Sequence, residues 1–383
     1  MYSKDDINKL YLEIAASIDI SDEMFTAAVS EYESLGKWID KNTPKYRISI
    51  FPQGSFGLGT VVKPITDADD YDLDLVCQFE EQYGLTAKQL KVDVVKPLLV
   101  EYKKTSRDIE NKRRCWHVEY EDIPNFHMDV IPAYANAKLK RINITDHDEE
   151  HDTYAYMGSN PSGYITWFFE RCAMQRERLL KDYLKEHREI VFSADIEKVK
   201  RCKIKTPLQR VVQLLKRHRD IMFAEDNSGN KPISIIITTI AATLYQEEDN
   251  VVDALTNILL ATPDWINRNK KNDLYYIENP SYPGENFADK WNAHPERATA
   301  FFEWIKQATT DLAGEDLYKM SLVDMGDNVK RCFGEKTSKT VFSKVAEEQR
   351  AGIKNGSLKV DTSSGNLSIK GTVPVPATRH YGE

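Results

Sequence analysis

The stretch from Gln53 to Asp74 constrains this chain most, because it joins a glycine-rich turn to two aspartates one residue apart (QGSFGLGTVVKPITDADDYDLD). Tyr71–Phe79 is predicted to be a strand, since it is rich in aromatic and β-branched residues and polar and apolar residues alternate at its start. Side chains at i and i+2 of a strand leave the same face, so Asp72 and Asp74 should point the same way. Paired carboxylates need a cation between them, and hard oxygen ligands suit Mg2+, with Mn2+ as a substitute.

The turn before these aspartates carries Gln53, Gly54 and Ser55, between a predicted strand at Tyr46–Phe51 and a short predicted helix. Glycine lets the backbone approach a ligand closely, and backbone amides beside a serine hydroxyl can bind phosphate oxygens. The turn and the acids together predict a metal-bound nucleoside triphosphate. The stretch matches neither the Walker A loop nor the GxGxxG fingerprint. Taken separately, the glycine turn and the aspartate pair each favour a plainer interpretation, in which an ordinary turn precedes a strand and the acids are solvated.

A third carboxylate strengthens the metal hypothesis. Arg113–Tyr120 and Asn125–Ile131 are predicted strands joined by a turn at Asp122–Pro124, and Asp129 lies between apolar residues in the second strand. An aspartate among apolar neighbours is costly to bury without a partner, and a shared metal would supply one. Two neighbouring aspartates and a third on a later strand are what a two-metal phosphoryl-transfer centre needs. The sequence therefore predicts two Mg2+ ions, one of them shared by Asp129.

These residues carry a family resemblance. A GS turn, a DxD strand and a later aspartate form the signature of the polymerase-β-like nucleotidyltransferases. Within them the sequence resembles the bacterial CD-NTases, relatives of cyclic GMP-AMP synthase also called SMODS proteins, which make cyclic oligonucleotide second messengers in the anti-phage systems known as CBASS. The likeness spans roughly residues 20–330 and includes three further segments, Gln209–Asp220 (QRVVQLLKRHRD), Pro232–Leu244 (PISIIITTIAATL) and Glu285–Trp291 (ENFADKW).

The resemblance implies an α/β (α+β) fold, with a nucleotidyltransferase lobe built on a mixed sheet and a C-terminal helical-bundle lobe. It also implies an enzyme that joins nucleoside triphosphates, ATP and GTP among them, into a purine-containing cyclic di- or trinucleotide with release of pyrophosphate. Asp72, Asp74 and Asp129 would hold the metals, and Asp129 could also accept the proton of the attacking ribose hydroxyl. Cyclisation rests on the resemblance, because the same residues serve enzymes with linear products.

Two residues of the second half gain a role from the resemblance. Taken alone, Lys216 belongs to a basic cluster of the kind that is usually solvated, and Ser234 sits where a helix N-cap belongs. The segments LLKRHRD and PISIIITT match the family's phosphate-binding lysine and serine. Lys216 and Ser234 are therefore expected opposite Gly54 and Ser55, across the β- and γ-phosphates.

The domain organisation is predicted in four parts. Residues 1–42 form N-terminal helices, with a long backing helix that starts at Ser21 or Asp22. Residues 43–160 form the catalytic core, 161–350 the helical lobe and 351–383 a flexible tail. The polar run from residue 135 to 162, with His147 and His151, is predicted to be a solvated loop. In some relatives a partner enzyme conjugates the tail, although Glu383 is not the small final residue expected for that role. We therefore hypothesise that the tail binds a regulatory or conjugating protein encoded in the same defence operon.

Composition is typical of a cytoplasmic enzyme. The 383 residues are 41% hydrophobic and 29% charged, which is ordinary for a globular protein. A net charge of -8 argues against non-specific coating of nucleic acid. The five cysteines form no CxxC pair, so free thiols in a reducing compartment are expected. Neither a transmembrane stretch nor a signal-peptide pattern occurs, so no membrane association is predicted.

Three other functions remain open at this point. A polymerase that makes linear oligonucleotides or adds nucleotides would use the same residues and give phosphatase-sensitive products. A nucleotidylyltransferase acting on a protein or small molecule would label a second substrate. A catalytically silent nucleotide sensor would bind nucleotides without turnover, but such a module has no need for a complete set of three aspartates.

Overall fold

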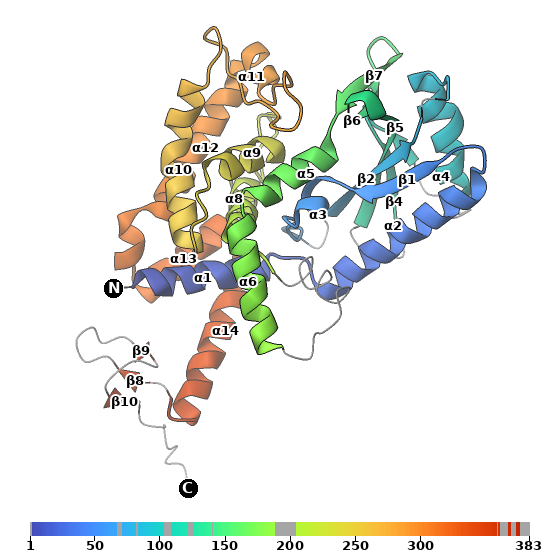
Figure 1. The fold of residues 1–383 in the computed structure, drawn as a ribbon. Coiled ribbons are helices and arrows are strands. Elements are labelled where there is room, and N and C mark those ends of the chain that lie inside the picture. The colour runs from blue at the N-terminus through green and yellow to red at the C-terminus, as the bar shows by residue number, and fades with distance from the viewer. Residues whose placement is uncertain are drawn as a thin grey trace.

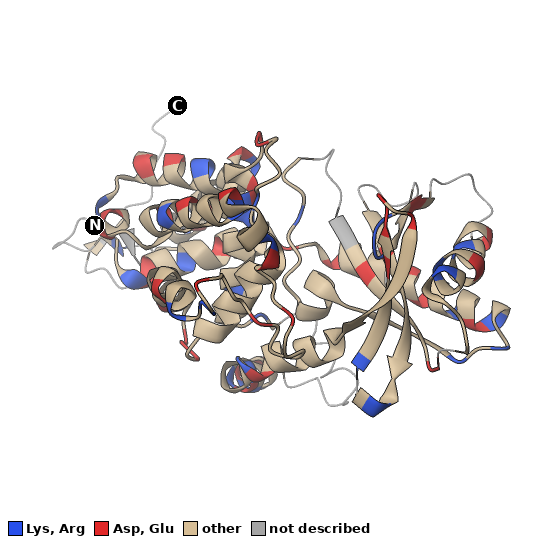
Figure 2. Ribbon diagram, turned by 90° about the horizontal axis from the view of Figure 1, so that it is seen from above, with Lys and Arg blue, Asp and Glu red and all other residues tan. Residues whose placement is uncertain are grey.

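The computed structural model describes residues 2–66, 71–81, 83–102, 109–120, 126–139, 141–187, 204–357, 359–360, 367–368 and 373–375. A mixed sheet with its covering helices forms one lobe, and a bundle of helices forms the other (Figure 1). The turn predicted at Asp122–Pro124 lies outside the described residues. Acidic and basic positions are interspersed along the outer helices of both lobes, so neither lobe presents a single-sign face in this view (Figure 2).

The sheet is mixed, and its central pair is parallel. Within the described residues the strand order is β1-β2-β5-β4-β3, and a β6–β7 hairpin continues from β5. The β2–β5 pair runs parallel and the other pairs run antiparallel. The strands are β1 (Ile48–Pro52), β2 (Tyr71–Phe79), β3 (Ile109–Asn111), β4 (Trp116–Glu119), β5 (Phe126–Asn136), β6 (Arg141–Asp148) and β7 (Thr153–Ser159).

The β6–β7 hairpin contradicts the solvated loop predicted for residues 135–162. Ile142 and Ile144 alternate with more exposed residues along β6 and join a small buried cluster on the sheet. The acidic run that suggested a loop is in fact the end of β6 and the turn of this hairpin. Period-two alternation was present in RINIT, but the charges that follow it masked the strand.

One face of the sheet is covered by helices. Helix α2 (Asp22–Asn42) packs on β1 and on α4 (Lys96–Tyr102), and a π-helix, η1 (Gln89–Val95), precedes α4. The predicted cap of the long helix is confirmed, because Ser21 Oγ accepts a hydrogen bond from the backbone N–H of Met24 at 3.2 Å. Apolar residues of β2 and β5 face these helices and form the core of this lobe. The opposite face of the strands is therefore left for the site.

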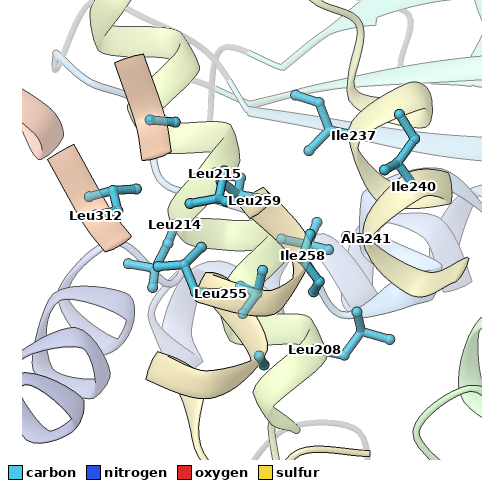
Figure 3. Close-up of a cluster of buried hydrophobic side chains, with 14 of the residues drawn as sticks. Leu208, Leu214, Leu215, Ile237, Ile240, Ala241, Leu255, Ile258, Leu259 and Leu312 are labelled. Atoms are coloured by element: carbon cyan, nitrogen blue, oxygen red, sulfur yellow. The ribbon is translucent and has the colours of Figure 1, made fainter. Parts of the chain in front are cut away.

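The helical lobe is organised around α8 (Pro207–Met222), whose leucines face those of its neighbours (Figure 3). Helix α8 packs against α1 (Lys4–Ser17), α9 (Ser234–Leu244), α10 (Val251–Arg268) and α12 (Pro295–Ala313). Helix α1 thus belongs to this lobe, although it precedes α2 in the sequence. The remaining helical elements are α5 (Pro161–Glu170), α6 (Ala173–Glu186), α11 (Asp289–Ala293), η3 (Glu315–Lys319), α13 (Leu322–Phe333) and α14 (Glu335–Lys354).

The last part of the chain extends from the end of α14, which points away from the body of the lobe (Figure 1). Its described residues form three two-residue strands that pair antiparallel, β8 (Lys359–Val360), β9 (Leu367–Ser368) and β10 (Val373–Pro374). Among the helices that the structure describes, none combines the length and hydropathy of a membrane span.

Candidate active site

Strand register brings the three predicted acidic positions to one face of the sheet. In the parallel β2–β5 pair, Asp74 lies opposite Asp129, and the backbone of Asp72 lies opposite His127. Residues in register on paired strands share a face, as do residues two apart on one strand. The intervening Leu73 is fully buried on the helix-covered side. The aspartate positions therefore lie on the side away from α2, as predicted.

Gly54 is the first residue of the short helix α3 (Gly54–Leu58), in a backbone conformation that favours glycine. Its φ is +58°, and a Cβ at this position would lie 2.2 Å from Oδ2 of Asp74. The N–H of Gln53 donates a 2.8 Å hydrogen bond to the backbone oxygen of Asp74. The glycine turn is thus built directly against the acidic strand, with no side chain between the Gly54 backbone and the carboxylate.

Asp129 is held by side chains from the neighbouring strand. Nδ1 of His117 lies 2.8 Å from Oδ1 of Asp129, and a carboxylate can only accept, so the imidazole donates. The Cys115 thiol also lies within hydrogen-bonding reach of this carboxylate. Burial and the nearby negative charge of Asp129 raise the pKa of Cys115, so the thiol stays neutral. Both contacts orient an aspartate whose side chain remains 24% exposed.

The basic cluster on α8 is buried, which contradicts the solvated alternative. Lys216 is 7% exposed, and its Nζ donates to the backbone oxygen of Thr60 at 3.1 Å. Arg219 Nη1 donates to Ser234 Oγ at 2.8 Å. Ser234 begins α9 without capping it, because the cap residue is Ile233 and no side-chain cap bond forms. Capping therefore does not explain this serine.

Asp220 pairs with two cations, Arg219 of α8 and Lys231 of the segment before α9. Oδ1 of Asp220 lies 2.7 Å from Nη2 of Arg219 and 2.7 Å from Nζ of Lys231. Burial by itself would raise the pKa of Asp220, but the charge of Arg219 and the hydrogen bond from Lys231 hold this pKa below its ordinary value. Asp220 therefore stays ionised and fixes the direction of both side chains.

A second set of contacts joins α8 to residues 58–63, the segment that follows the glycine turn. Side chains on or just before α8 donate hydrogen bonds to backbone oxygens of this segment. The bonds run from Lys205 to Gly59 (2.6 Å), from Gln209 to Leu58 (2.8 Å), from Gln213 to Val61 (2.8 Å), from Lys216 to Thr60 (3.1 Å) and from Arg217 to Lys63. This ladder fixes the segment to the helical lobe.

A cavity of about 700 Å3 lies between the two sets of residues. Gly54, Ser55 and Asp74 line one side, which we call the sheet wall. Lys216, Arg219 and Ser234 line the other side, which we call the helix wall. The structure thus brings Gly54, Ser55, Lys216 and Ser234 together around one space, as the family resemblance implies.

A second cavity of about 920 Å3 adjoins the first, and Gly54 and Lys231 line both. Arg113 and Arg114 line it from the sheet lobe, and Phe287 and Trp291 line it from the helical lobe. Both arginines pair with Asp146, through Nε···Oδ1 distances of 2.8 and 3.2 Å. The charges of Arg113 and Arg114 are therefore partly neutralised, yet both side chains border a space large enough for a ligand.

Sequence reasoning missed several residues of this region. Thr60 lines the first cavity with its side chain 1% exposed, and its Oγ1 has no hydrogen-bond partner among the residues that the structure describes. Gln209 and Gln213 were also missed. Their signal was present, since polar residues four apart on an otherwise apolar helix face indicate buried hydrogen bonds rather than surface.

The two histidines of the β6–β7 hairpin, His147 and His151, pair with nearby side chains. His147 stacks on Tyr154 with ring centroids 4.1 Å apart, and its Nε2 lies 3.0 Å from Asp152. Nδ1 of His151 lies 2.9 Å from Asp148 at the surface. Of the described residues, two other groups offer three metal-ligand atoms close together, His117–His127–Asp129 and His218–Asp311–Cys332.

The fold and this cleft define a nucleotidyltransferase, and comparison with known proteins identifies its family. Residues 6–171 match the Second Messenger Oligonucleotide or Dinucleotide Synthetase (SMODS) domain. The chain is 30% identical over 312 residues to c-di-GMP synthase from Roseivirga ehrenbergii, covering 79% of this chain and 78% of the relative. It is 25% identical over 350 residues to cyclic dinucleotide synthase CdnG from Bradyrhizobium diazoefficiens, covering 87% and 81%.

The fold agrees with this assignment. The structure of the CD-NTase CdnG from Bradyrhizobium diazoefficiens in complex with GTP matches with a TM-score of 0.69 at 22% identity, covering 89% of this chain and 98% of that one. The chain belongs to the CD-NTase family, the SMODS-type synthetases of cyclic oligonucleotides. The predicted family, fold class and nucleotidyltransferase activity are confirmed, and cyclic products are favoured over the linear, substrate-labelling and silent alternatives.

Proposed function

We propose that the chain joins two molecules of GTP into a cyclic dinucleotide. In each round a ribose hydroxyl of one nucleotide attacks the α-phosphorus of the other, the bond to the leaving pyrophosphate breaks, and the hydroxyl proton passes to a base. Two rounds close the ring and release two pyrophosphates. The observation that carries the proposal is the cavity that has an acidic sheet wall opposite a basic helix wall. The choice of guanine is supported by a c-di-GMP synthase among the relatives.

The triphosphate would lie between the two walls. Gly54 and Ser55 would contact it from the turn, where the absence of a side chain lets the backbone approach closely. Lys216 and Ser234 would contact it from the helical lobe, because a lysine ammonium is a compact charge that suits phosphate. Gln53 would hold the turn in place through its backbone bond to Asp74.

The acidic positions fit Mg2+, since Asp74 and Asp129 lie in register on one face of the sheet and carboxylate oxygens are the ligands that this ion prefers. Asp72, Asp74 and Asp129 would hold two such ions, with Mn2+ as a substitute. Bound there, the ions would supply Lewis-acid stabilisation of the charge that develops on the phosphate and its leaving group. Asp129 would accept the ribose hydroxyl proton on a carboxylate oxygen, while His117 keeps that carboxylate oriented.

The adjoining cavity would hold the second nucleotide. Phe287 and Trp291 present aromatic surface to it, and aromatic side chains are common partners of nucleobases. Arg113 and Arg114, which line the same space, would meet phosphate charge there. After the first bond forms, the linear intermediate would turn around in the joined cavities for the second round.

The direct test is to incubate the purified protein with labelled ATP, GTP, CTP and UTP plus Mg2+ and to measure the masses of phosphatase-resistant products. We expect a single product with the mass of a cyclic guanine dinucleotide, and none when EDTA removes the metal. A product of other bases would overturn the assignment of guanine. Phosphatase-sensitive products alone would overturn cyclisation.

The biological setting remains a prediction. A regulatory or conjugating protein at residues 351–383, a role in anti-phage defence and a cytoplasmic location are expected from the family. Removal of residues 355–383 should leave synthesis intact in the purified protein, because α14 and the cavity residues remain.

A further inference from the structure

Two histidines lie beside Asp129 on the same face of the sheet. His117 on β4 lies opposite Asp129 in the antiparallel β4–β5 pair. His127 lies two residues before Asp129 on β5, so it leaves the same face. One imidazole is thus beside Asp129 across the strands, and the other precedes it along the strand. The proposed function uses the carboxylate and leaves the imidazoles only a supporting role.

The three side chains are arranged as a ligand set. One ligand atom from each lies within 4.8 Å of those of the others. The His117 and His127 rings are 4.2 Å apart at their centroids and tilted by 46°, so they are not stacked flat against each other. In a tetrahedral zinc site with bonds of about 2.0–2.1 Å, neighbouring ligand atoms lie roughly 3.3 Å apart. The 2.8 Å between His117 Nδ1 and Asp129 Oδ1 needs to open by only about half an ångström to reach that spacing.

The chemistry of the set favours a different ion from the one at the aspartates. Two imidazoles and one carboxylate match the protein ligands of open zinc sites, which keep a fourth position for water. Mg2+ prefers oxygen ligands and would gain little from the imidazoles. The His117 and Asp129 side chains are 17% and 24% exposed, so an ion from solution can reach them.

We propose that His117, His127 and Asp129 form a site for Zn2+, and that an ion bound there withdraws Asp129 from the catalytic centre and stops synthesis. His117 would bind through Nδ1 after its ring hydrogen moves to Nε2, which leaves the ring neutral. The inhibitory part of this proposal rests on the proposed role of Asp129 in synthesis, whereas the binding part does not. Zn2+ and Mg2+ would therefore compete for one carboxylate.

Binding is tested without nucleotides by titrating the protein with Co2+, a coloured substitute for Zn2+. We expect visible absorption bands of a four- or five-coordinate ion, which Zn2+ abolishes. His117→Gln and His127→Gln should each weaken Co2+ binding by about tenfold or more, since even outer-shell changes at metal sites cost 10- to 100-fold. His151→Gln, which removes an exposed histidine of the β6–β7 turn, is the matched control and should bind as the wild type does.

Asp72→Asn separates this proposal from the proposed function. Asp72 is not a member of the ligand set, so the variant should keep the Co2+ spectrum while it loses synthesis. Asp129→Asn should lose both. If Asp72→Asn kept full synthesis, the catalytic assignment would fail while the zinc site stood.

Inhibition is then measured as the Zn2+ concentration that halves synthesis. This concentration should rise with Mg2+ in the wild type and should be about tenfold higher in His127→Gln. Circular dichroism checks folding, and His127→Gln decides the result if His117→Gln does not fold. Wild-type Co2+ affinity in the folded histidine variants would show that His117 only orients Asp129, and would overturn the zinc site. Unchanged Zn2+ sensitivity in His127→Gln would also overturn it.

Discussion

The two walls of the cleft are positioned by different means. Asp74 on the sheet wall takes its position from strand register, which also places Asp129 of β5 opposite it. On the helix wall, Lys216 and Arg219 are buried cations. Lys216 donates to Thr60, which lies 156 residues earlier in the chain, and Arg219 donates to Ser234 at the start of α9. The comparison shows that alternation along a strand and its pairing with one neighbour are enough to bring the acidic positions to one face. A buried basic helix needs its partners from elsewhere in the fold.

The helix wall is also tied to the turn of the sheet wall. The hydrogen-bond ladder from α8 to residues 58–63 crosses between the lobes directly after the glycine turn. Lys216 is itself part of the ladder, so this lysine and the turn keep a fixed spacing. The sheet wall would therefore determine the rate of the chemical step, and the helix wall would determine how tightly the triphosphate is held.

The largest effect is expected from the sheet wall. Asp72→Asn together with Asp74→Asn should lower the yield of phosphatase-resistant product by about a thousandfold or more, because the metal ligands are lost. Asp93→Asn, an exposed aspartate on η1, is the matched control and should be fully active. Circular dichroism should show that the double variant is folded. Equal turnover by the double variant and the control would refute the metal centre.

A smaller effect should follow from crowding the same carboxylate. Gly54→Ala puts a methyl group 2.2 Å from Oδ2 of Asp74, and that flexible carboxylate must move. We expect synthesis to fall about a hundredfold. Gly84→Ala is the control, since Gly84 also has a positive φ, +70°, but nothing lies within 4 Å of an added Cβ. Both variants should lose about 1 kcal/mol of stability from backbone strain, so comparable synthesis in the two would count against contact between the turn and Asp74.

The ladder predicts an effect on stability. Gln213→Leu leaves the buried carbonyl of Val61 without its 2.8 Å hydrogen bond. The free energy of unfolding, measured by urea denaturation, should fall by about 1–3 kcal/mol. Gln246→Leu, at an exposed position, should change it by less than about 0.5 kcal/mol. Equal unfolding free energies for the two variants would show that the ladder does not hold the lobes together.

The sequence predicted the sheet wall well. The strand Tyr71–Phe79 is confirmed with its bounds, since its composition and alternation are local properties. The placement of Asp129 beside Asp74 also agrees, because it needed only two strands to pair. The prediction failed at residues 135–162, where charged turn residues obscured the β6–β7 hairpin.

The helix wall was harder to predict. Lys216 and Ser234 were assigned only through the family resemblance, and their burial and contacts could not be read from the helical period. The basic cluster around Lys216 was typical of a solvated surface, yet Arg219 pairs with Asp220 inside the cleft. Whether a charged residue on a helix is solvated depends on which element packs over it. Here that element is a loop about 150 residues earlier in the chain.

Steady-state kinetics with GTP tests most directly whether the acidic strands determine the rate of the chemical step and the helix wall determines the affinity for the triphosphate. Lys216→Ala should raise KM about tenfold, or about 1.4 kcal/mol of binding, and change kcat little. Asp129→Asn should lower kcat about a thousandfold and change KM far less. Lys319→Ala, an exposed lysine, serves as the control. An unchanged KM in Lys216→Ala, or a full kcat in Asp129→Asn, would contradict a triphosphate held between α8 and the acidic strands.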